Sequence, residues 1–162
     1  MISTKGRYAL RVMIDLAEQP AERPVPLKEI AERQGISKKY LEIIMKDLVD
    51  GKLVKGSSGK GGGYVLLRKP EEYSVGEIVE RMEGTLAPVA CLQEGADPCP
   101  RYGACATIGL WSELDSLVHD FLFSKKLSEL TRKNRAELPR KGNGRADPDG
   151  KPDGTEGRRN GR

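Results

Sequence analysis

The sequence is poor in histidine and in aromatic residues, since its 162 residues include one His, one Trp and two Phe. With a single histidine and no paired nucleophile and base, the chain offers no catalytic constellation, which argues against an enzyme. It also lacks an uninterrupted apolar run, and its N-terminal stretch mixes charges into the apolar positions. The sequence therefore predicts neither a signal peptide nor a membrane span. We expect a cytoplasmic protein without a membrane partner.

The net charge of +4 is a weak indication of a nucleic-acid partner, because it is unevenly distributed. Between Arg132 and Arg162, ten Lys or Arg residues stand against five acids, which leaves about −1 for residues 1–131. Basic tails are commonly solvated chain. Residues 132–162 are predicted to be a basic, disordered tail, because they carry almost no apolar residue from Pro139 onward. Evidence for a nucleic-acid partner therefore has to come from local sequence patterns.

Three helical patterns in the first fifty residues predict a helix-turn-helix. Apolar residues repeat at helical spacing over residues 4–18, behind Ser3 or Thr4 as the cap. A short second helix starts at Leu27, Gly35 marks a turn, and Ser37 caps a third helix. Two short apolar strands, LVK and YVLL, follow on either side of GSSGKGGG and predict a hairpin. The fold class is thus mainly α with a small β-hairpin wing.

The remainder divides into three further segments. Ser74 and Glu77 predict a capping box for a fourth helix that ends at Gly84, which closes a winged helix-turn-helix domain at residues 1–84. Residues 85–104 form a loop that contains cysteines. A broad apolar stripe then predicts a helix over about residues 105–123, within a dimerisation region at 105–131. Such a stripe needs a partner, either the chain's own core or, more often after a small winged domain, a second copy.

The early turns of the third helix carry candidate DNA contacts. In a helix-turn-helix these turns enter the major groove, where Lys38 and Lys39 would meet phosphates. Tyr40 or Glu42 would reach a base edge, and Glu42 could accept from a cytosine amine. The plainer alternative is a solvated helix face. The candidate DNA-binding residues are Ser37, Lys38, Lys39, Tyr40, Glu42, Lys46, Ser57, Ser58, Lys60, Gly61, Gly62, Tyr64, Lys5 and Arg7.

The glycine-rich hairpin tip is a second candidate contact with DNA. Its glycines let the main chain approach a groove, and Lys60 and the serines can meet phosphates. A nucleotide-binding loop would need Ser or Thr after the lysine and a helix beyond it. Here Gly61 follows Lys60 and a strand comes next. A plain flexible hairpin remains the other alternative.

All three cysteines, Cys91, Cys99 and Cys105, lie within fifteen residues. Three thiols cannot all pair within one chain, and a reducing compartment disfavours stable disulfides, so metal binding or redox chemistry competes as the explanation. Their spacing lacks the Cys-x-x-Cys pattern common in zinc sites, yet thiolates suit zinc and iron-sulfur clusters about equally. The lone His119 lies about 21 Å along a helix from Cys105, so we expect a structural role for it.

Taken together, KGRYALRVMIDLA, the PLKEIAERQGISKKYLEIIMKDL helix pair, the KGSSGKGGGYVL wing, the SVGEIVERMEG helix and the cysteine loop resemble the IscR-type iron-sulfur cluster regulators. The similarity covers about residues 1–131. The resemblance implies a bacterial homodimeric transcription factor, often a repressor, that binds a pseudo-palindromic operator in double-stranded DNA. It also implies that Cys91, Cys99 and Cys105 hold an iron-sulfur cluster, expected to be [2Fe-2S].

The sequence departs from that family at the fourth ligand of the cluster. Ile108 stands where the family's namesake has a histidine, and Arg7 stands where nitric-oxide-sensing relatives have an aspartate. A third branch, which regulates cysteine metabolism, keeps the fold without a cluster, and the APV before Cys91 resembles that branch. The expected function is a repressor controlled by its cluster. The alternatives are a cluster-free thiol sensor of the same fold and a zinc-stabilised interaction module.

Overall fold

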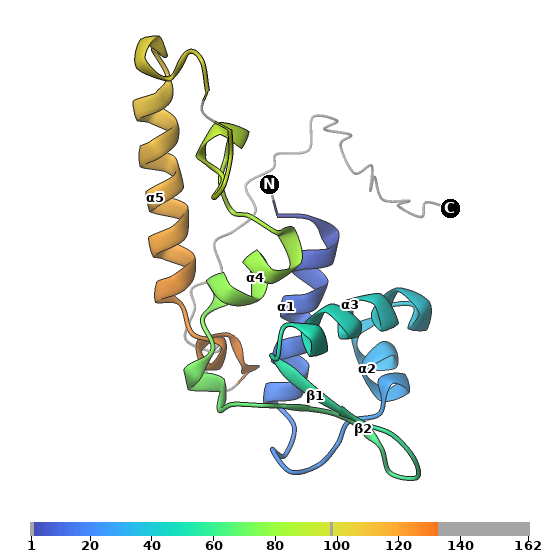
Figure 1. Cartoon of the computed structure of the whole chain (residues 1–162). Coiled ribbons are helices and arrows are strands. Elements are labelled where there is room, and N and C mark those ends of the chain that lie inside the picture. The colour runs from blue at the N-terminus through green and yellow to red at the C-terminus, as the bar shows by residue number, and fades with distance from the viewer. Residues whose placement is uncertain (1, 98, 133–162) are drawn as a thin grey trace, which may run out of the picture.

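The computed structural model describes residues 2–97 and 99–132, and Figure 1 shows the course of the chain. The expectation of a disordered tail falls on residues outside this part, apart from Arg132. The described elements are α1 (Thr4–Ala17), α2 (Leu27–Gln34), α3 (Lys38–Asp50), β1 (Val54–Ser57), β2 (Gly63–Leu66), α4 (Val75–Glu83) and α5 (Ile108–Ser124), with short 3₁₀ helices at Pro70–Glu72, Ala90–Leu92, Tyr102–Ala104 and Leu127–Leu130.

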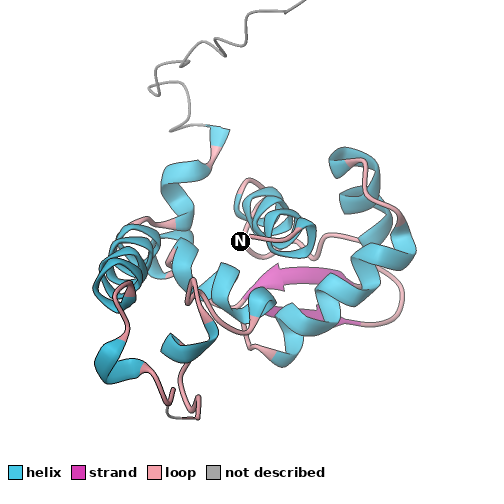
Figure 2. Ribbon diagram, turned by 90° about the horizontal axis from the view of Figure 1, so that it is seen from above, coloured by secondary structure: helices cyan, strands magenta, loops and turns pink. Residues whose placement is uncertain are grey.

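The first four helices and the hairpin bury one hydrophobic core. Its fully buried side chains include Met13 of α1, Ile30 of α2, Leu41 and Ile44 of α3, and Ile78 of α4. α1, α3 and α4 each contribute buried residues three or four positions apart, as an amphipathic helix must, and in α2 the partly buried Leu27 and Ala31 pack beside Ile30. Figure 2 shows the hairpin beside α1, with α5 set apart from it at the left of the view.

The wing is a two-stranded antiparallel sheet with a short extension. Val54 pairs with Leu66 and Ser57 with Gly63 in its register. The loop between α1 and α2 adds a single bridge, because Val25 and Tyr64 exchange both backbone hydrogen bonds at 3.0 and 2.9 Å. This bridge ties the wing to the helix-turn-helix.

The buried Tyr73 joins the base of the wing to the end of the chain. Its hydroxyl donates to the carbonyl of Leu53 at 2.7 Å and accepts the backbone N–H groups of Leu67 and Arg68 at 2.9 and 2.8 Å. Its own carbonyl accepts the N–H of Leu127 at 3.0 Å. Leu127 is fully buried, so the segment after α5 returns to the winged domain.

Helix α5 packs closely against the winged domain near its C-terminal end. A side chain at Gly76 of α4 would lie 2.2 Å from the ring of Phe123, so glycine allows this close approach. Just beyond α5, Ser74 forms a β-bridge with Lys126, and the N–H of Val75 donates to the carbonyl of Lys125 at 2.8 Å. The sequence patterns did not predict this return.

The predicted fold class, mainly helical with a small hairpin wing, is confirmed. Ser3 caps α1 and Ser37 caps α3, and Gly84 ends α4 in the left-handed conformation at φ 79°. The predicted capping box is only half formed. Ser74 accepts from the N–H of Glu77, whereas the Glu77 carboxylate pairs with Arg68 at 2.6 Å, because that cation lies beside it. Among residues 2–97 and 99–132, no helix combines the length and apolar character that a bilayer crossing requires.

Replacing Tyr73 by Phe should lower the free energy of unfolding by about 2–3 kcal/mol, since two N–H groups and one carbonyl at the base of the wing lose their partner. Urea denaturation followed by circular dichroism measures the change. Tyr102→Phe is the matched control, because Tyr102 is exposed. Equal stabilities for the two variants would contradict the role of Tyr73.

Candidate nucleic-acid interface and cysteine loop

The N-terminal half of α3 presents an exposed polar face at the end of the tight turn. Gly35 closes α2 in the left-handed conformation at φ 63°, and the Ser37 hydroxyl accepts the N–H of Tyr40 at 3.3 Å. This cap leaves the other first-turn N–H groups of α3 directed toward solvent. Within the described part of the chain, no ion pair engages the exposed side chains of Lys38, Lys39, Glu42 and Lys46. They are available to an outside partner.

Tyr40 differs from its charged neighbours because it is half-buried. Its ring meets Tyr8 of α1 edge to face, with centroids 6.0 Å apart and planes at 73°. Arg11 lies over the other ring, with its guanidinium carbon 5.2 Å from the Tyr8 centroid. Packing between two aromatic rings restricts the rotamer of Tyr40. Tyr40 therefore offers a fixed side chain at the start of α3.

Ile43 is an exposed residue of the same helix that the sequence patterns missed. Its side chain is 49% exposed, and it lies one turn after Lys39 and Tyr40. Its position in the helical repeat could have identified it, because it lies on the opposite side of the helix from the buried residues Leu41, Ile44, Met45 and Leu48. An exposed aliphatic group on such a face is suited to contact a thymine methyl group.

The tip of the wing is shaped by glycine. Gly59 and Gly61 take positive φ values of 94° and 82°, and the N–H of Gly62 donates to the carbonyl of Gly59 at 3.0 Å. At Gly62 a side chain would lie 2.4 Å from the carbonyl oxygen of Ser57. The Ser57 hydroxyl lies 3.3 Å from both the N–H and the carbonyl of Gly63, so it also closes the hairpin. Ser58, Lys60 and Gly61 are exposed at this tip.

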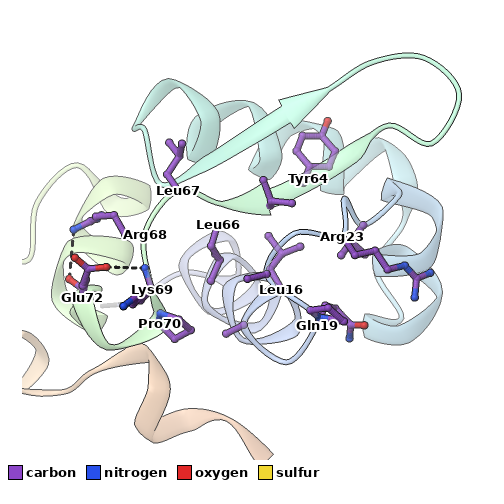
Figure 3. Close-up of a pocket in the computed structure, with 15 residues that line it drawn as sticks. Leu16, Gln19, Arg23, Tyr64, Leu66, Leu67, Arg68, Lys69, Pro70 and Glu72 are labelled. Atoms are coloured by element: carbon purple, nitrogen blue, oxygen red, sulfur yellow. Dashed lines mark hydrogen bonds between the residues drawn. The ribbon is translucent and has the colours of Figure 1, made fainter.

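Tyr64 is a predicted DNA contact that also packs within the domain. Its backbone forms the bridge to Val25, and its half-buried ring packs against the core. A side chain at Gly56 would lie 3.2 Å from this ring. Figure 3 shows the Tyr64 hydroxyl directed away from Leu16 and Leu66.

The two predicted contacts on α1 already have intramolecular partners. The ammonium of Lys5 forms an ion pair with Asp47 of α3 at 2.5 Å. The guanidinium of Arg7 donates to the Thr4 hydroxyl at 3.1 Å and to the Ser3 carbonyl at 3.4 Å. Arg7 is exposed, while Lys5 is partly covered. Lys5 would therefore contribute less free charge to a phosphate than Lys38 or Lys39.

A polar network fixes the turn of the helix pair against α1. Asp15 is 4% exposed and accepts two hydrogen bonds from Arg33 at 2.9 and 2.8 Å and one from Gln34 at 2.9 Å. Arg11 donates to the side-chain oxygen of Gln34 at 3.2 Å and also reaches its backbone carbonyl. The last residues of α2 are thereby fixed just before the turn at Gly35, which sets the orientation of α3.

The three cysteines lie in the loop between α4 and α5, and all are reduced and half-buried. Cys91 belongs to the 3₁₀ helix Ala90–Leu92, and Cys105 follows the one at Tyr102–Ala104. Across residues 2–97 and 99–132, no three His, Cys, Asp or Glu side chains converge closely enough to hold a metal ion. Three soft thiol donors fit a thiolate-bound centre by their chemistry. A single chain in this conformation does not gather them.

Cys105 is prepared to ionise. Its sulfur lies 3.5 Å from the hydroxyl of Thr107. Trp111 donates its indole N–H to the same hydroxyl oxygen at 3.2 Å, which leaves the hydroxyl proton free to point at sulfur. The hydrogen bond from the Thr107 side chain, aided by the backbone N–H groups of Thr107 and Ile108, lowers the pKa of the Cys105 thiol. A thiolate at this position is a better metal ligand and a better nucleophile.

His119 lies closer to the cysteine loop than its sequence distance suggested. It lines a pocket of about 670 Å³ together with Leu92 and Glu94, which follow Cys91, and with Asp115 of α5. The estimate along the helix was made from Cys105, but the Cys91 end of the loop turns back beside α5 (Figure 1). The imidazole stacks on Phe123 at 4.2 Å. This packing fits the predicted structural role, and the shared pocket adds oxygen and nitrogen donors beside the loop.

Helix α5 leaves the outer part of its apolar stripe exposed. None of its residues is buried against the described part of the chain. The stripe repeats every three or four residues, which places its members on one face of the helix. Its exposed members are Leu110, Leu114, Leu117 and Phe121, which are 59%, 38%, 61% and 61% exposed, whereas Trp111, Val118 and Leu122 of the predicted stripe are half-buried.

The chain is similar to known transcriptional regulators over most of its length. Residues 2–133 match the model of the Rrf2 family, described as iron-dependent transcriptional regulators. The HTH-type transcriptional regulator IscR of Aliivibrio salmonicida is 38% identical over 136 residues, which cover 84% of this chain and 80% of that protein. Among solved structures, IscR of T. potens has a TM-score of 0.66 at 32% identity, covering 86% of this chain and 92% of the other. CymR, the global cysteine regulator of B. subtilis, has a TM-score of 0.65 at 38% identity, covering 80% and 95%.

Thr107→Val should raise the pKa of Cys105, because it removes the hydroxyl that stabilises the thiolate. The background is metal-free protein in which Cys91 and Cys99 are replaced by Ser. Since the pKa of Cys105 is lowered, its alkylation by iodoacetamide should reach half its maximal rate at a lower pH than that of a free cysteine peptide. Thr107→Val should move this midpoint upward, while Thr107→Ser should keep it. Identical profiles for Val and Ser would contradict the hydrogen-bond account.

Proposed function

The chain belongs to the Rrf2 family of iron-dependent transcriptional regulators, and we propose that it is a repressor whose affinity for its operator is controlled by an iron-sulfur cluster on three cysteines. It is a DNA-binding regulator of the IscR and CymR type and not an enzyme. The observation that carries the finer proposal is the position of the cysteine loop. It lies between the winged domain and the uncovered helix α5, so a change in the loop acts on the joint between them.

The polar face of α3 and the tip of the wing form the proposed DNA-binding surface. The lysines at the start of α3 are unpaired within the described chain and would bind phosphates, as would Lys60 and the serines of the wing. Tyr40, fixed by Tyr8, and Glu42 would read base edges, with Ile43 as an apolar contact. The polar network of Asp15, Arg33 and Gln34 would keep the orientation of α3 fixed.

A homodimer through α5 is supported by the stripe from Leu110 to Phe121. A single winged domain makes few base contacts, whereas two copies read both halves of a pseudo-palindrome. Isologous contact of identical stripes would cover the four apolar side chains of both copies at once. The spacing of the two α3 helices then depends on how α5 joins the winged domain.

Cys91, Cys99 and Cys105 are the proposed ligands of the cluster, which would be [2Fe-2S]. Such a cluster supplies a redox-active and oxygen-sensitive centre when it is bound. The chain contributes three thiols, and Thr107 favours the thiolate form of one of them. The fourth position has no histidine at residue 108, so it falls to another donor, and Glu94 and His119 lie on one pocket beside the loop. Three thiolates with one weak ligand predict a labile centre.

A cluster-free thiol sensor is the second candidate. It is favoured by the structural similarity to CymR and by the lowered pKa of Cys105. In that case the same loop would respond to oxidation of its thiols. The two candidates share the DNA surface and differ in what the purified protein contains.

Lys38→Ala and Lys39→Ala should weaken binding to every DNA sequence and reduce its dependence on salt, because each removes a phosphate contact. Tyr40→Ala and Glu42→Ala should instead change the preferred sequences. Selection from a random DNA library for each variant, beside titrations at several salt concentrations, separates the two classes. As a control, deleting residues 140–162 should leave the ratio of operator to random affinity unchanged. An unaltered preference in both Tyr40→Ala and Glu42→Ala would exclude base reading by these residues.

Protein purified without oxygen should be coloured and contain iron and sulfide, and Cys91→Ser, Cys99→Ser and Cys105→Ser should each abolish the colour without unfolding the winged domain. Ile108→His should slow the loss of colour in air, because it adds a nitrogen donor at the first residue of α5. Visible spectra, iron and sulfide counts and circular dichroism measure these effects. Colourless protein with free thiols would favour the thiol sensor, and stoichiometric zinc would indicate a structural metal site.

A further inference from the structure

A pocket of about 360 Å³ lies on the side of the wing, away from the DNA-binding tip and from the cysteine loop. Its walls are the end of α1, the turn after it, strand β2 and the segment that leads to Tyr73. Figure 3 shows Leu16, Leu66 and Pro70 around this space, with the guanidinium of Arg23 directed outward. The interior is therefore mainly apolar, and charged groups stand at the rim.

One wall of this pocket is an open edge of the sheet. Tyr64 exchanges both of its hydrogen bonds with Val25, so its N–H and carbonyl point away from β1. Backbone groups alternate in direction along a strand, so those of Leu66 point to the same side. The bond from the N–H of Leu67 to the carbonyl of Leu53 fits this alternation. In the described part of the chain, no partner outside the hairpin is found for the N–H and carbonyl of Leu66.

The open edge exists because the neighbouring segment turns away. In register with β2, Arg23 would stand opposite Leu66, but Pro24 between Arg23 and Val25 has no N–H to donate. The N–H of Arg23 instead donates to the carbonyl of Pro20 at 3.0 Å, which closes a turn. The strand therefore ends after one bridge and leaves room for another extended segment.

The described part of the chain ends beside the pocket at the open edge of β2. The backbone N–H of Arg132 donates to the carboxylate of Glu18 at 2.6 Å, and its guanidinium pairs with the same carboxylate at 3.3 Å. Glu18 is the residue that ends α1. A second hollow, lined by Thr131 and Arg132, shares Ala17 and Gln19 with the first. The chain beyond Arg132 thus starts from the entrance of the pocket.

The segment that follows contains a single large apolar residue. Residues 133–140 read KNRAELPR, and Leu138 is the one Leu, Ile, Val, Met, Phe, Tyr or Trp between residues 133 and 162. Five residues lie between Arg132 and Leu138, so the six steps from one to the other can span roughly 20 Å when extended. That length is enough to reach from the hollow at Arg132 into the neighbouring pocket, because the two share lining residues.

We propose that residues 133–139 dock along the free edge of β2, with Leu138 in the pocket between Leu16, Leu66 and Pro70. Backbone hydrogen bonds to Leu66 would extend the sheet, as a bound peptide does in strand addition, and Leu138 would supply the apolar contact. The rest of the tail, from Arg140 onward, takes no part. The docked segment would cover an edge that otherwise invites pairing with another chain.

Hydrogen exchange at the amide of Leu66 tests the proposal without DNA or metal. In the full chain this amide should exchange about tenfold more slowly than in Leu138→Ser, because the variant loses the apolar anchor of the docked segment. The amide of Val65, which pairs with Lys55 in the hairpin, should be unchanged and serves as the internal control. Deleting residues 141–162 should also leave both rates unchanged.

A chain that ends at Arg132 allows the complementary measurement. Adding the synthetic peptide KNRAELPR should restore slow exchange at Leu66, whereas the same peptide with Ser for Leu should not. Equal rates at Leu66 in the full chain and in Leu138→Ser would overturn the proposal. Slow exchange that persists in the chain ending at Arg132 without peptide would overturn it as well, because another group would then cover the edge.

Discussion

Helix α5 buries none of its residues against the described part of its own chain, and its exposed apolar residues form a stripe of the kind that marks an interaction surface. The helix is held closely near its C-terminal end, where Gly76 admits Phe123 and the returning segment pairs with Ser74. Its first turns extend away from the winged domain, beside the cysteine loop (Figure 1). Covering the stripe with a second copy would fix two winged domains at one distance.

This arrangement explains why the loop is a suitable place for a sensor. Cys105 stands three residues before α5, and its partner Thr107 is also bonded to Trp111 on the first turn of that helix. At the other end, α5 leads through Leu127 to Tyr73, which anchors the base of the wing. A conformational change in the loop would thus shift both the proposed dimer contact and the wing. Regulation requires that DNA bind more tightly to one arrangement of the loop and α5 than to the other.

The sequence predicted those parts of the fold that depend on local signals. The serine caps, the glycine turn and the apolar periodicity are read within one turn of a helix, and they predicted where α1, α2, α3 and α4 begin. What the patterns missed depends on contacts between distant segments. The return of Leu127 to Tyr73 and the pairing of Glu77 with Arg68 rather than with its own helix end are such cases. The pocket that His119 shares with Leu92 and Glu94 was not predicted, because distance along a helix says nothing about how a loop folds back beside it.

The molecular mass in solution tests the central claim most directly, since the regulation proposed here needs two winged domains joined through α5. Light scattering after gel filtration should give twice 17.8 kDa for the full chain and 17.8 kDa for the Leu117→Glu, Phe121→Glu variant. Ser116→Glu is the matched control, because it adds a charge to an exposed position of the same helix outside the stripe. A full chain that runs as a monomer, or a double variant that remains dimeric, would contradict the account.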